Sequence, residues 1–256
     1  MPDIANHELQ TRLPLGTVQI WKADLSAANG DWERKIPELS EEEQAKAVRY
    51  KAPDLQRRFT ASRWLLRRLA AFYTGTDAAC LTWAYSEHGK PNLSGSQLRF
   101  NLSHTADSWI GAFAWNMELG VDVERVRPMP NAAQLVSRFF SSRERAEFDH
   151  TPEEERLDAL FRGWTRKEAF IKAIGRGLSF PLDRFSVPLG NTLPHSIQDL
   201  ADPELEGRDW HLASLSMPTG WHAALVTEGV PERLEIRDWT PETETWLLSE
   251  NSARRF

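Results

Sequence analysis

One stretch, residues 151–178, constrains the fold more than any other part of the chain. Its apolar residues recur with helical spacing, which predicts a long helix with one buried face. We expect Thr151 to cap this helix, with Glu154 completing a capping box, and Gly175 and Gly177 to end it. The apolar positions are Leu157, Leu160, Phe161, Trp164 and Ile171.

The buried face of this predicted helix continues onto an acidic residue, Glu168. A carboxylate on an inward face is unfavourable unless it is paired or bound to a cation. Lys172 lies one turn further along and is a neighbour of Glu168 on the helix surface. Taken alone, Glu168 is best explained as a solvated residue beside the apolar stripe. A functional interpretation requires other carboxylates that converge on it.

Two such carboxylates occur in the segment Gly120–Glu124, whose apolar and polar residues alternate as in a strand. Asp122 and Glu124 should therefore point to the same side. Two like charges at that distance repel, so one would take up a proton unless a cation lies between them. Oxygen ligands favour Mg²⁺ or Mn²⁺ and disfavour zinc. The alternative is that the two acids lie on the solvated face of an edge strand.

Four motifs together carry a resemblance to a known family. The segments are Gly89-Lys90-Pro91, Phe100-Asn101-Leu102-Ser103-His104, Gly120–Glu124, and Trp164 to Leu178 with its Trp-x-x-Lys-Glu-Ala core. In this order they resemble the 4′-phosphopantetheinyl transferase superfamily, in its larger single-chain branch typified by the surfactin-synthetase-activating enzyme. The motifs span roughly residues 40 to 187, and such a set is far more specific than any one of them.

The resemblance implies an α+β fold of two similar halves, each with helices packed on an antiparallel sheet, related by a pseudo-twofold axis. We expect an N-terminal half over residues 1–124, a C-terminal half over 125–240, and a polar, frayed tail over 241–256. Strands are expected over residues 18–25, 81–85, 98–102, 109–115, 119–124, 185–187, 210–216, 221–227 and 234–239. Those between residues 98 and 124 should form a consecutive antiparallel meander.

The resemblance also implies an activity, namely transfer of 4′-phosphopantetheine from coenzyme A to a serine of an apo acyl or peptidyl carrier protein. Adenosine 3′,5′-bisphosphate would be released. The implied metal ligands for Mg²⁺, or Mn²⁺, are Asp122, Glu124 and Glu168. Glu168 is the expected base, directly or through metal-bound water, with Lys172 as the alternative.

Further residues are implied to bind the coenzyme A co-substrate. Lys46 and Arg58 best match the basic residues that hold its 3′-phosphate in the family, with Arg63 a weaker match. The other expected contacts are Lys90, Pro91, Ser103, His104, Asp122 and Lys172.

The carrier protein is expected to be a small, acidic helical bundle, and the resemblance places its docking surface near residues 129–140. Arg138, Phe139 and Phe140 offer a cation and two aromatic rings there. Because adjacent helix positions face different ways, at least one of the two phenylalanines should be buried. The sequence leaves open whether the carrier serves fatty-acid, polyketide, peptide or lysine-pathway machinery.

Charge, cysteine content and the lack of long apolar runs exclude several classes of protein for this chain. The 256 residues carry a formal net charge of −6, which disfavours nucleic acid as a general partner. A single cysteine, Cys80, excludes an internal disulfide and a thiolate metal cluster. No apolar run approaches membrane-spanning length, and residues 1–6 lack the features of a signal peptide. We therefore expect a cytoplasmic protein, most simply a monomer, without a membrane partner.

Two other functions compete with the transferase. One is a different magnesium-dependent phosphoryl-transfer enzyme, such as a nuclease or nucleotide hydrolase, which would use the same three acids; the chain has no P-loop, and its charge is acidic. The other is a non-catalytic module of the same fold that binds carrier proteins. Loss of Asp122, Glu168 or Lys172 would indicate such a module, and all three are present.

Overall fold

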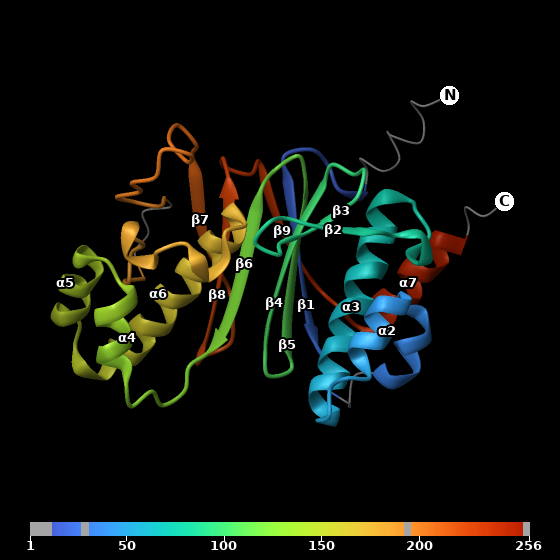
Figure 1. The fold of residues 1–256 in the computed structure, drawn as a ribbon, viewed down its shortest axis with the longest axis horizontal. Helices are drawn as coiled ribbons and strands as arrows, with labels where there is room; N and C mark the ends of the chain where they lie inside the picture. The colour runs from blue at the N-terminus through green and yellow to red at the C-terminus, as the bar shows by residue number, and fades with distance from the viewer. Residues whose placement is uncertain (1–11, 27–30, 192–195, 253–256) are drawn as a thin grey trace.

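The structure is a computed structural model that describes residues 12–26, 31–191 and 196–252. Strands occupy the middle of the molecule and helices cover its two outer sides (Figure 1). The strands are β1 (Thr17–Asp24), β2 (Trp83–Tyr85), β3 (Pro91–Leu93), β4 (Leu98–Thr105), β5 (Ser108–Trp115), β6 (Leu119–Arg125), β7 (Trp210–Leu215), β8 (Trp221–Glu228) and β9 (Arg233–Asp238). The helices are η2 (Trp32–Glu38), α2 (Glu41–Ala47), α3 (Pro53–Thr74), η3 (Ala78–Cys80), α4 (Ala132–Phe139), α5 (Ser142–His150), α6 (Glu153–Ile174), η4 (Gly177–Ser179), η5 (Leu182–Arg184) and α7 (Pro241–Ser252).

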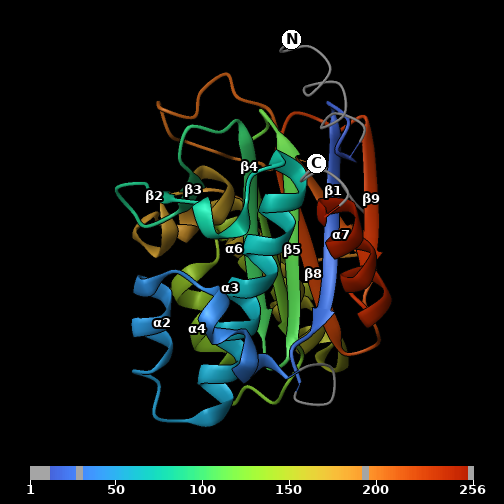
Figure 2. The same ribbon diagram turned by 90° about the vertical axis from the view of Figure 1, so that its right-hand side faces the viewer.

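Two sheets form the centre of the fold. The larger has the strand order β4-β5-β1-β9, and the smaller has the order β6-β8-β7. All pairs are antiparallel except β1 and β9, which run parallel. Figure 2 shows α3 lying along the larger sheet, with α7 beside it. The expected α+β class, with helices packed on largely antiparallel sheets, is confirmed.

Each sheet packs a 22-residue helix on its outer side, α3 on the larger and α6 on the smaller. The inner faces meet in an apolar cluster that joins Val18 and Ile110 of the larger sheet to Val121, Val123 and Leu225 of the smaller. Helices thus lie on the outer side of each sheet, as the expected α+β class implies. A pseudo-twofold relation between two similar halves stays a prediction.

The meander predicted for residues 98–124 is wrong at its third strand. β4 and β5 pair as expected, but β6 pairs with β8 and belongs to the smaller sheet. The reason is that β6 is covered on both faces. Val121 and Val123 pack in the cluster between the sheets, while Asp122 on the opposite face is 4% exposed. The alternative of a solvated strand face for Asp122 is therefore also wrong.

The ends of α6 show one further difference from expectation. Gly175 ends the helix in the left-handed conformation, with φ of 71°, as predicted. The capping box at Thr151 is absent, because the cap position is Pro152 and the Thr151 hydroxyl donates to the carbonyl of Glu147 at 2.9 Å. Thr151 therefore closes the preceding helix, α5, and does not open α6.

The close approach of α6 to β6 depends on Gly120. A Cβ atom at this position would overlap the carbonyl oxygen of Ala169 and the backbone nitrogen of Ala173, and would lie 2.9 Å from the Ala173 Cα atom. Only glycine therefore lets the helix backbone rest directly on the strand. This contact fixes where the last turns of α6 lie along β6 and how close they come to it.

The C-terminal segment completes the N-terminal half. β9 adds the edge strand beside β1, and α7 follows it across residues predicted to be a frayed tail. Leu247 of α7 is 2% exposed in the cluster around α3, and the Trp246 ring lies 5.2 Å from that of Phe72. The strand pairing thus departs from the boundaries expected at residues 124 and 240. β6 lies in the smaller sheet, and residues from 233 onward return to the larger one.

No helix in the described ranges is long and apolar enough to cross a membrane. Residues 1–6, on which the absence of a signal peptide was argued, lie outside the described residues.

The contact at Gly120 makes a testable prediction. Gly120→Ala should lower the free energy of unfolding by about 2–4 kcal/mol, because its methyl group overlaps backbone atoms that cannot rotate away. Urea unfolding would measure this loss. Gly207→Ala is the control, because its Cβ would meet open space and only the left-handed backbone, with φ of 78°, would oppose it, at about 1 kcal/mol. Equal losses in the two variants would show that the helix–strand contact tolerates a side chain.

Candidate active site

Asp122 lies at the centre of a polar cluster formed by three elements. Its Oδ1 atom accepts hydrogen bonds from Lys172 Nζ of α6 at 2.6 Å and from Ser103 Oγ of β4 at 2.7 Å. Lys172 Nζ also lies 3.0 Å from Ser103 Oγ. The cluster therefore joins Ser103, from the larger sheet, to the strand and helix of the other half.

The second oxygen of Asp122, Oδ2, is buried. It makes no hydrogen bond to any residue that the structure describes. A buried carboxylate oxygen without a donor is unfavourable unless a ligand or cation supplies the missing contact. This orphaned atom is the clearest indication that something binds at the site.

Glu124 lies next to Asp122 on the same face of β6. Its Oε2 atom accepts hydrogen bonds from Thr105 Oγ1 and Arg127 Nη1, both at 3.3 Å. Burial, followed by the charge of Asp122, raises the pKa of the Glu124 carboxyl, while Arg127 and Thr105 oppose this rise.

Glu168 approaches the same two carboxylates from α6. Burial is the largest cause that raises the pKa of Glu168, to about 7, and repulsion by Asp122 and Glu124 adds to it, while Lys172 opposes it. The charges of Asp122 and Glu124 thus act on Glu168, as the sequence predicted. A group with this pKa can accept or release a proton near neutral pH.

The donor set of this cluster fits a hard divalent cation, since it offers only carboxylate and hydroxyl oxygens beside one lysine. In the described part of the chain, however, no three His, Cys, Asp or Glu side chains are arranged closely enough to hold a metal ion. Lys172 instead supplies the positive charge next to Asp122. The assignment of Asp122, Glu124 and Glu168 as metal ligands stays a prediction.

A basic cavity of about 540 Å³ lies on the N-terminal half, beside the end of β4. Lys46, Arg58, Arg63 and His104 line it, together with the rings of Tyr50 and Phe59. The expected phosphate-binding cations are thus brought together. Burial lowers the pKa of His104, and the charges of Lys172 and Arg58 lower it further. These charges link the cavity to the carboxylate cluster.

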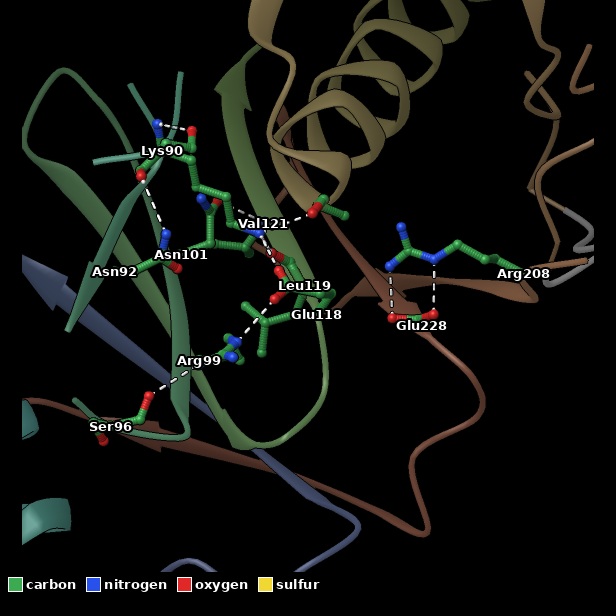
Figure 3. A network of polar contacts seen from close by, with 12 residues as sticks. Lys90, Asn92, Ser96, Arg99, Asn101, Glu118, Leu119, Val121, Arg208 and Glu228 are labelled. Atoms are coloured by element: carbon green, nitrogen blue, oxygen red, sulfur yellow. Dashed lines mark hydrogen bonds and ion pairs between the residues drawn. The ribbon is translucent and has the colours of Figure 1, made fainter. Parts of the chain in front are cut away.

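Lys90, unlike the cations of the basic cavity, is bound by groups of the protein itself (Figure 3). Its ammonium group donates to Glu118 Oε2 at 2.8 Å, to the Leu119 carbonyl at 3.1 Å and to the Ala173 carbonyl at 2.8 Å. The side chain is 9% exposed. Lys90 therefore ties the β2–β3 hairpin to the start of β6 and to the end of α6. Pro91 begins β3 and pairs with Tyr85. A direct contact of either residue with coenzyme A stays a prediction.

Sequence reasoning missed the lysine immediately before Glu168. Lys167 and Glu144 form an ion pair with Nζ and Oε2 2.8 Å apart, and both side chains are 0% exposed. Lys167 also donates to the carbonyls of Leu182 and Phe185 at 2.6 and 2.9 Å. Glu144 accepts from the backbone of Ser141, at the start of α5. The pair holds α6 from a different face than the one that carries Glu168. Its only sequence signal was the lysine of the Trp-x-x-Lys-Glu-Ala motif.

The chain is similar in sequence to proteins of one known family. Residues 118–226 match the family model of the 4′-phosphopantetheinyl transferase superfamily, a segment that contains Asp122, Glu124, Glu168 and Lys172. The chain is 34% identical over 185 residues to the 4′-phosphopantetheinyl transferase HetI of Nostoc sp. (strain PCC 7120), covering 71% of this chain and 78% of that protein. The chain belongs to the 4′-phosphopantetheinyl transferase superfamily.

Other members of the superfamily are also similar. The transferase Sfp of Bacillus subtilis (strain 168) is 31% identical over 158 residues, which cover 61% of this chain and 69% of Sfp. Among solved structures, the Thermotoga maritima holo-[acyl-carrier-protein] synthase aligns with 47% of this chain and 64% of its own, at 21% identity and a TM-score of 0.29. That score is too low to support an argument about the arrangement of the halves. The sequence relatives alone establish membership.

The raised pKa of Glu168 predicts how the stability of the metal-free protein depends on pH. The folded state keeps a proton on Glu168 up to about pH 7, whereas an unfolded chain releases it near 4.5. The stabilising contribution of this carboxyl is thus fully present below pH 4.5 and is lost as the pH rises to about 7. The side chain of Glu168→Gln cannot ionise. The free energy of unfolding of this variant, relative to that of the parent, should therefore be about 1–2 kcal/mol higher at pH 8 than at pH 5.

Urea unfolding with a chelator at the two pH values measures this difference. Glu206→Gln, at an exposed loop position, serves as the control for removing a charge. A Glu168→Gln difference that is the same at pH 5 and pH 8 would contradict the assigned pKa.

Proposed function

We propose that this protein transfers 4′-phosphopantetheine from coenzyme A to a serine hydroxyl of an apo acyl or peptidyl carrier protein. The observation that carries the proposal is the cluster of Asp122, Glu124, Glu168 and Lys172, which lies inside the segment matched by the superfamily. The reaction forms a bond between the serine oxygen and the β-phosphorus of coenzyme A. The bond from that phosphorus to adenosine 3′,5′-bisphosphate breaks, and the serine proton passes to a base.

Glu168 is the best candidate for that base, because its pKa of about 7 leaves a substantial fraction ionised at neutral pH. Lys172 is the alternative, but its ammonium is held 2.6 Å from Asp122 Oδ1. An ammonium in this position is better suited to stabilising negative charge on the phosphates. The buried Lys167–Glu144 ion pair holds α6, which carries both Glu168 and Lys172, against the start of α5.

Mg²⁺, or Mn²⁺, is the cofactor that the carboxylates would hold, with Asp122, Glu124 and Glu168 as ligands. The orphaned Asp122 Oδ2 atom supports this assignment. When bound, such an ion neutralises charge that develops on the pyrophosphate during phosphoryl transfer. The remaining residues bind and orient the substrate.

The basic cavity is the proposed site of the coenzyme A nucleotide. Lys46, Arg58 and His104 would bind its 3′-phosphate, with Arg63 as a further cation. His104 lies at the end of β4, close enough for the charge of Lys172 to lower its pKa. A nucleotide in the cavity can therefore extend its pyrophosphate toward Lys172 and Asp122.

Incubation of a panel of apo carrier proteins with the enzyme, coenzyme A and Mg²⁺, followed by mass spectrometry, tests the function. The expected result is a carrier that gains one phosphopantetheine group and loses reactivity when its serine is changed to alanine. Modification of none of the carriers, despite measurable binding, would favour the non-catalytic module. Hydrolysis of nucleic acid or nucleotides without carrier modification would favour another phosphoryl-transfer enzyme. A cytoplasmic, monomeric protein without nucleic-acid or membrane partners stays part of this proposal.

The carboxylate cluster predicts a metal requirement. Excess chelator should abolish carrier modification, and added Mg²⁺ or Mn²⁺ should restore it. Glu168→Gln should lower the rate by about 10²–10⁴-fold, because it removes both a base and a ligand charge. The fold should persist, which circular dichroism checks. A rate within about threefold of the parent corresponds to a change of less than about 1 kcal/mol in the activation free energy. Such a result would show that Glu168 has no essential role in the reaction.

The basic cavity predicts selective loss of coenzyme A affinity. Lys46→Ala, Arg58→Ala and His104→Ala should each weaken binding by roughly tenfold or more, since a charge-assisted hydrogen bond contributes about 1.5–3 kcal/mol. The affinity for dephospho-coenzyme A, which lacks the 3′-phosphate, should fall much less in the same variants. Lys51→Ala, an exposed lysine outside the cavity, is the control. Titration calorimetry gives each affinity, and equal losses for both ligands would contradict a role in reading the 3′-phosphate.

The docking surface proposed for the carrier lies on α4. Phe140 is 0% exposed, which confirms that at least one of the two phenylalanines is buried. Phe139 is partly buried against Trp164, and the exposed Arg138 stacks over its ring at 5.0 Å. Arg138 and Phe139 therefore remain as the accessible cation and ring for an acidic partner.

Arg138→Glu should raise the KM for an acidic carrier by about three- to tenfold at low salt, leave coenzyme A binding unchanged and flatten the salt dependence. Steady-state kinetics at two ionic strengths provide the measurement. Arg34→Glu, which reverses an exposed charge on η2 in the other half, is the control. Unchanged carrier kinetics at low salt would place the docking surface elsewhere.

A further inference from the structure

Three alternate residues of β4 place their polar atoms against the neighbouring strand β6. Asn101 Oδ1 accepts from the Val121 backbone at 3.0 Å, Ser103 Oγ donates to Asp122 Oδ1 at 2.7 Å, and Thr105 Oγ1 donates to Glu124 Oε2 at 3.3 Å. β4 and β6 are edge strands of different sheets. Side chains of β4 therefore replace the missing backbone partner along this edge of β6. The same side chains meet both of its carboxylates.

The hydroxyl of Ser103 is fully used within the protein. It donates to Asp122, and it accepts from Lys172 Nζ at 3.0 Å and from the Val123 backbone at 3.4 Å. A serine hydroxyl offers one hydrogen and two acceptor sites, so these contacts exhaust its capacity. Ser103 is 7% exposed. A phosphate could bind this hydroxyl only by displacing one of the three partners.

These contacts fix the orientation of the Asp122 carboxylate. Ser103 and Lys172 both hold Oδ1, so rotation of the group would break two hydrogen bonds at once. Oδ2 is then the oxygen left without a partner, and it is buried. Thr105 restrains Glu124 in the same way through its Oε2 atom.

We propose that Ser103 and Thr105 are positioning residues, through which the N-terminal half orients the carboxylates of Asp122 and Glu124 toward a divalent cation. The inference rests on the proposed function, because that function supplies the cation. It differs from the expectation that Ser103 contacts a phosphate of coenzyme A. Hydrogen bonds to ligating carboxylates fix their direction, and removing such outer contacts lowers metal affinity by about 10–100-fold.

Ser103→Ala tests the proposal through metal affinity. Mn²⁺ binding is measured by electron paramagnetic resonance with saturating coenzyme A, so that activity is not the readout. The dissociation constant for Mn²⁺ should rise by about 10–100-fold. Affinity for adenosine 3′,5′-bisphosphate, measured without metal, should stay unchanged, because Ser103 leaves the nucleotide untouched. The Lys172–Asp122 ion pair remains in this variant, and thermal unfolding checks that the fold does too.

Matched variants of Thr105 test the proposal independently of Ser103. Thr105→Val removes the hydroxyl at nearly constant volume and should weaken Mn²⁺ binding, whereas Thr105→Ser should restore it. Ser108→Ala, which removes a hydroxyl at the start of β5, should leave Mn²⁺ binding as in the parent. Rescue by Thr105→Ser separates a role in orienting Glu124 from a loss of packing.

The outcomes separate this inference from the proposed function. Unchanged Mn²⁺ affinity in both Ser103→Ala and Thr105→Val, with tight binding by the parent, would overturn the inference alone. Weaker binding of adenosine 3′,5′-bisphosphate with unchanged Mn²⁺ affinity would make Ser103 a phosphate contact. Failure of the parent to bind Mn²⁺ in the presence of coenzyme A would overturn the metal-dependent function together with the inference.

Discussion

The contact between α6 and β6 at Gly120 determines where the charged groups of the carboxylate cluster lie. Because a Cβ atom there would overlap the helix backbone, the strand and the helix are as close as two backbones can pack. Asp122 and Glu124 follow Gly120 at spacings of two along β6. Glu168 and Lys172 lie one turn apart on α6. A wider separation would leave Lys172 too far to bind Asp122 at 2.6 Å.

Each half of the molecule contributes something that the other lacks. The smaller sheet and α6 supply the carboxylates and Lys172. Strand β4 supplies the hydroxyls that hold two of these carboxylates, and α2, α3 and β4 supply the basic cavity. Lys90 links the two parts again at the start of β6, where it binds Glu118 and the end of α6 (Figure 3). β9 and α7 return the end of the chain to the first half. The site therefore exists only when the halves are assembled.

The sequence predicted which side chains of the carboxylate cluster come together better than it predicted the path of the chain. The period of two in β6 placed Asp122 and Glu124 on one face, and the period of 3.6 in α6 placed Glu168 beside Lys172. Strand partners were harder, because local alternation does not tell which sheet a strand joins; β6 left the predicted meander for β8. The strand expected at residues 185–187 is reduced to one bridge between Ser186 and Gln198. The roles of Lys90 and Lys167 depend on distant carbonyl groups, which no local pattern reveals.

We propose that Asp122, Glu124 and Glu168 would hold one divalent metal ion beside the bond through which phosphopantetheine passes from coenzyme A to the carrier serine. A crystal structure with coenzyme A and Mn²⁺, with manganese located by its anomalous scattering, tests this claim most directly. We expect one manganese ion bound by the orphaned Oδ2 atom of Asp122, by Glu124 and by Glu168, with the coenzyme A pyrophosphate beside Lys172. Manganese bound elsewhere, or coenzyme A bound with its pyrophosphate remote from Asp122, would contradict it.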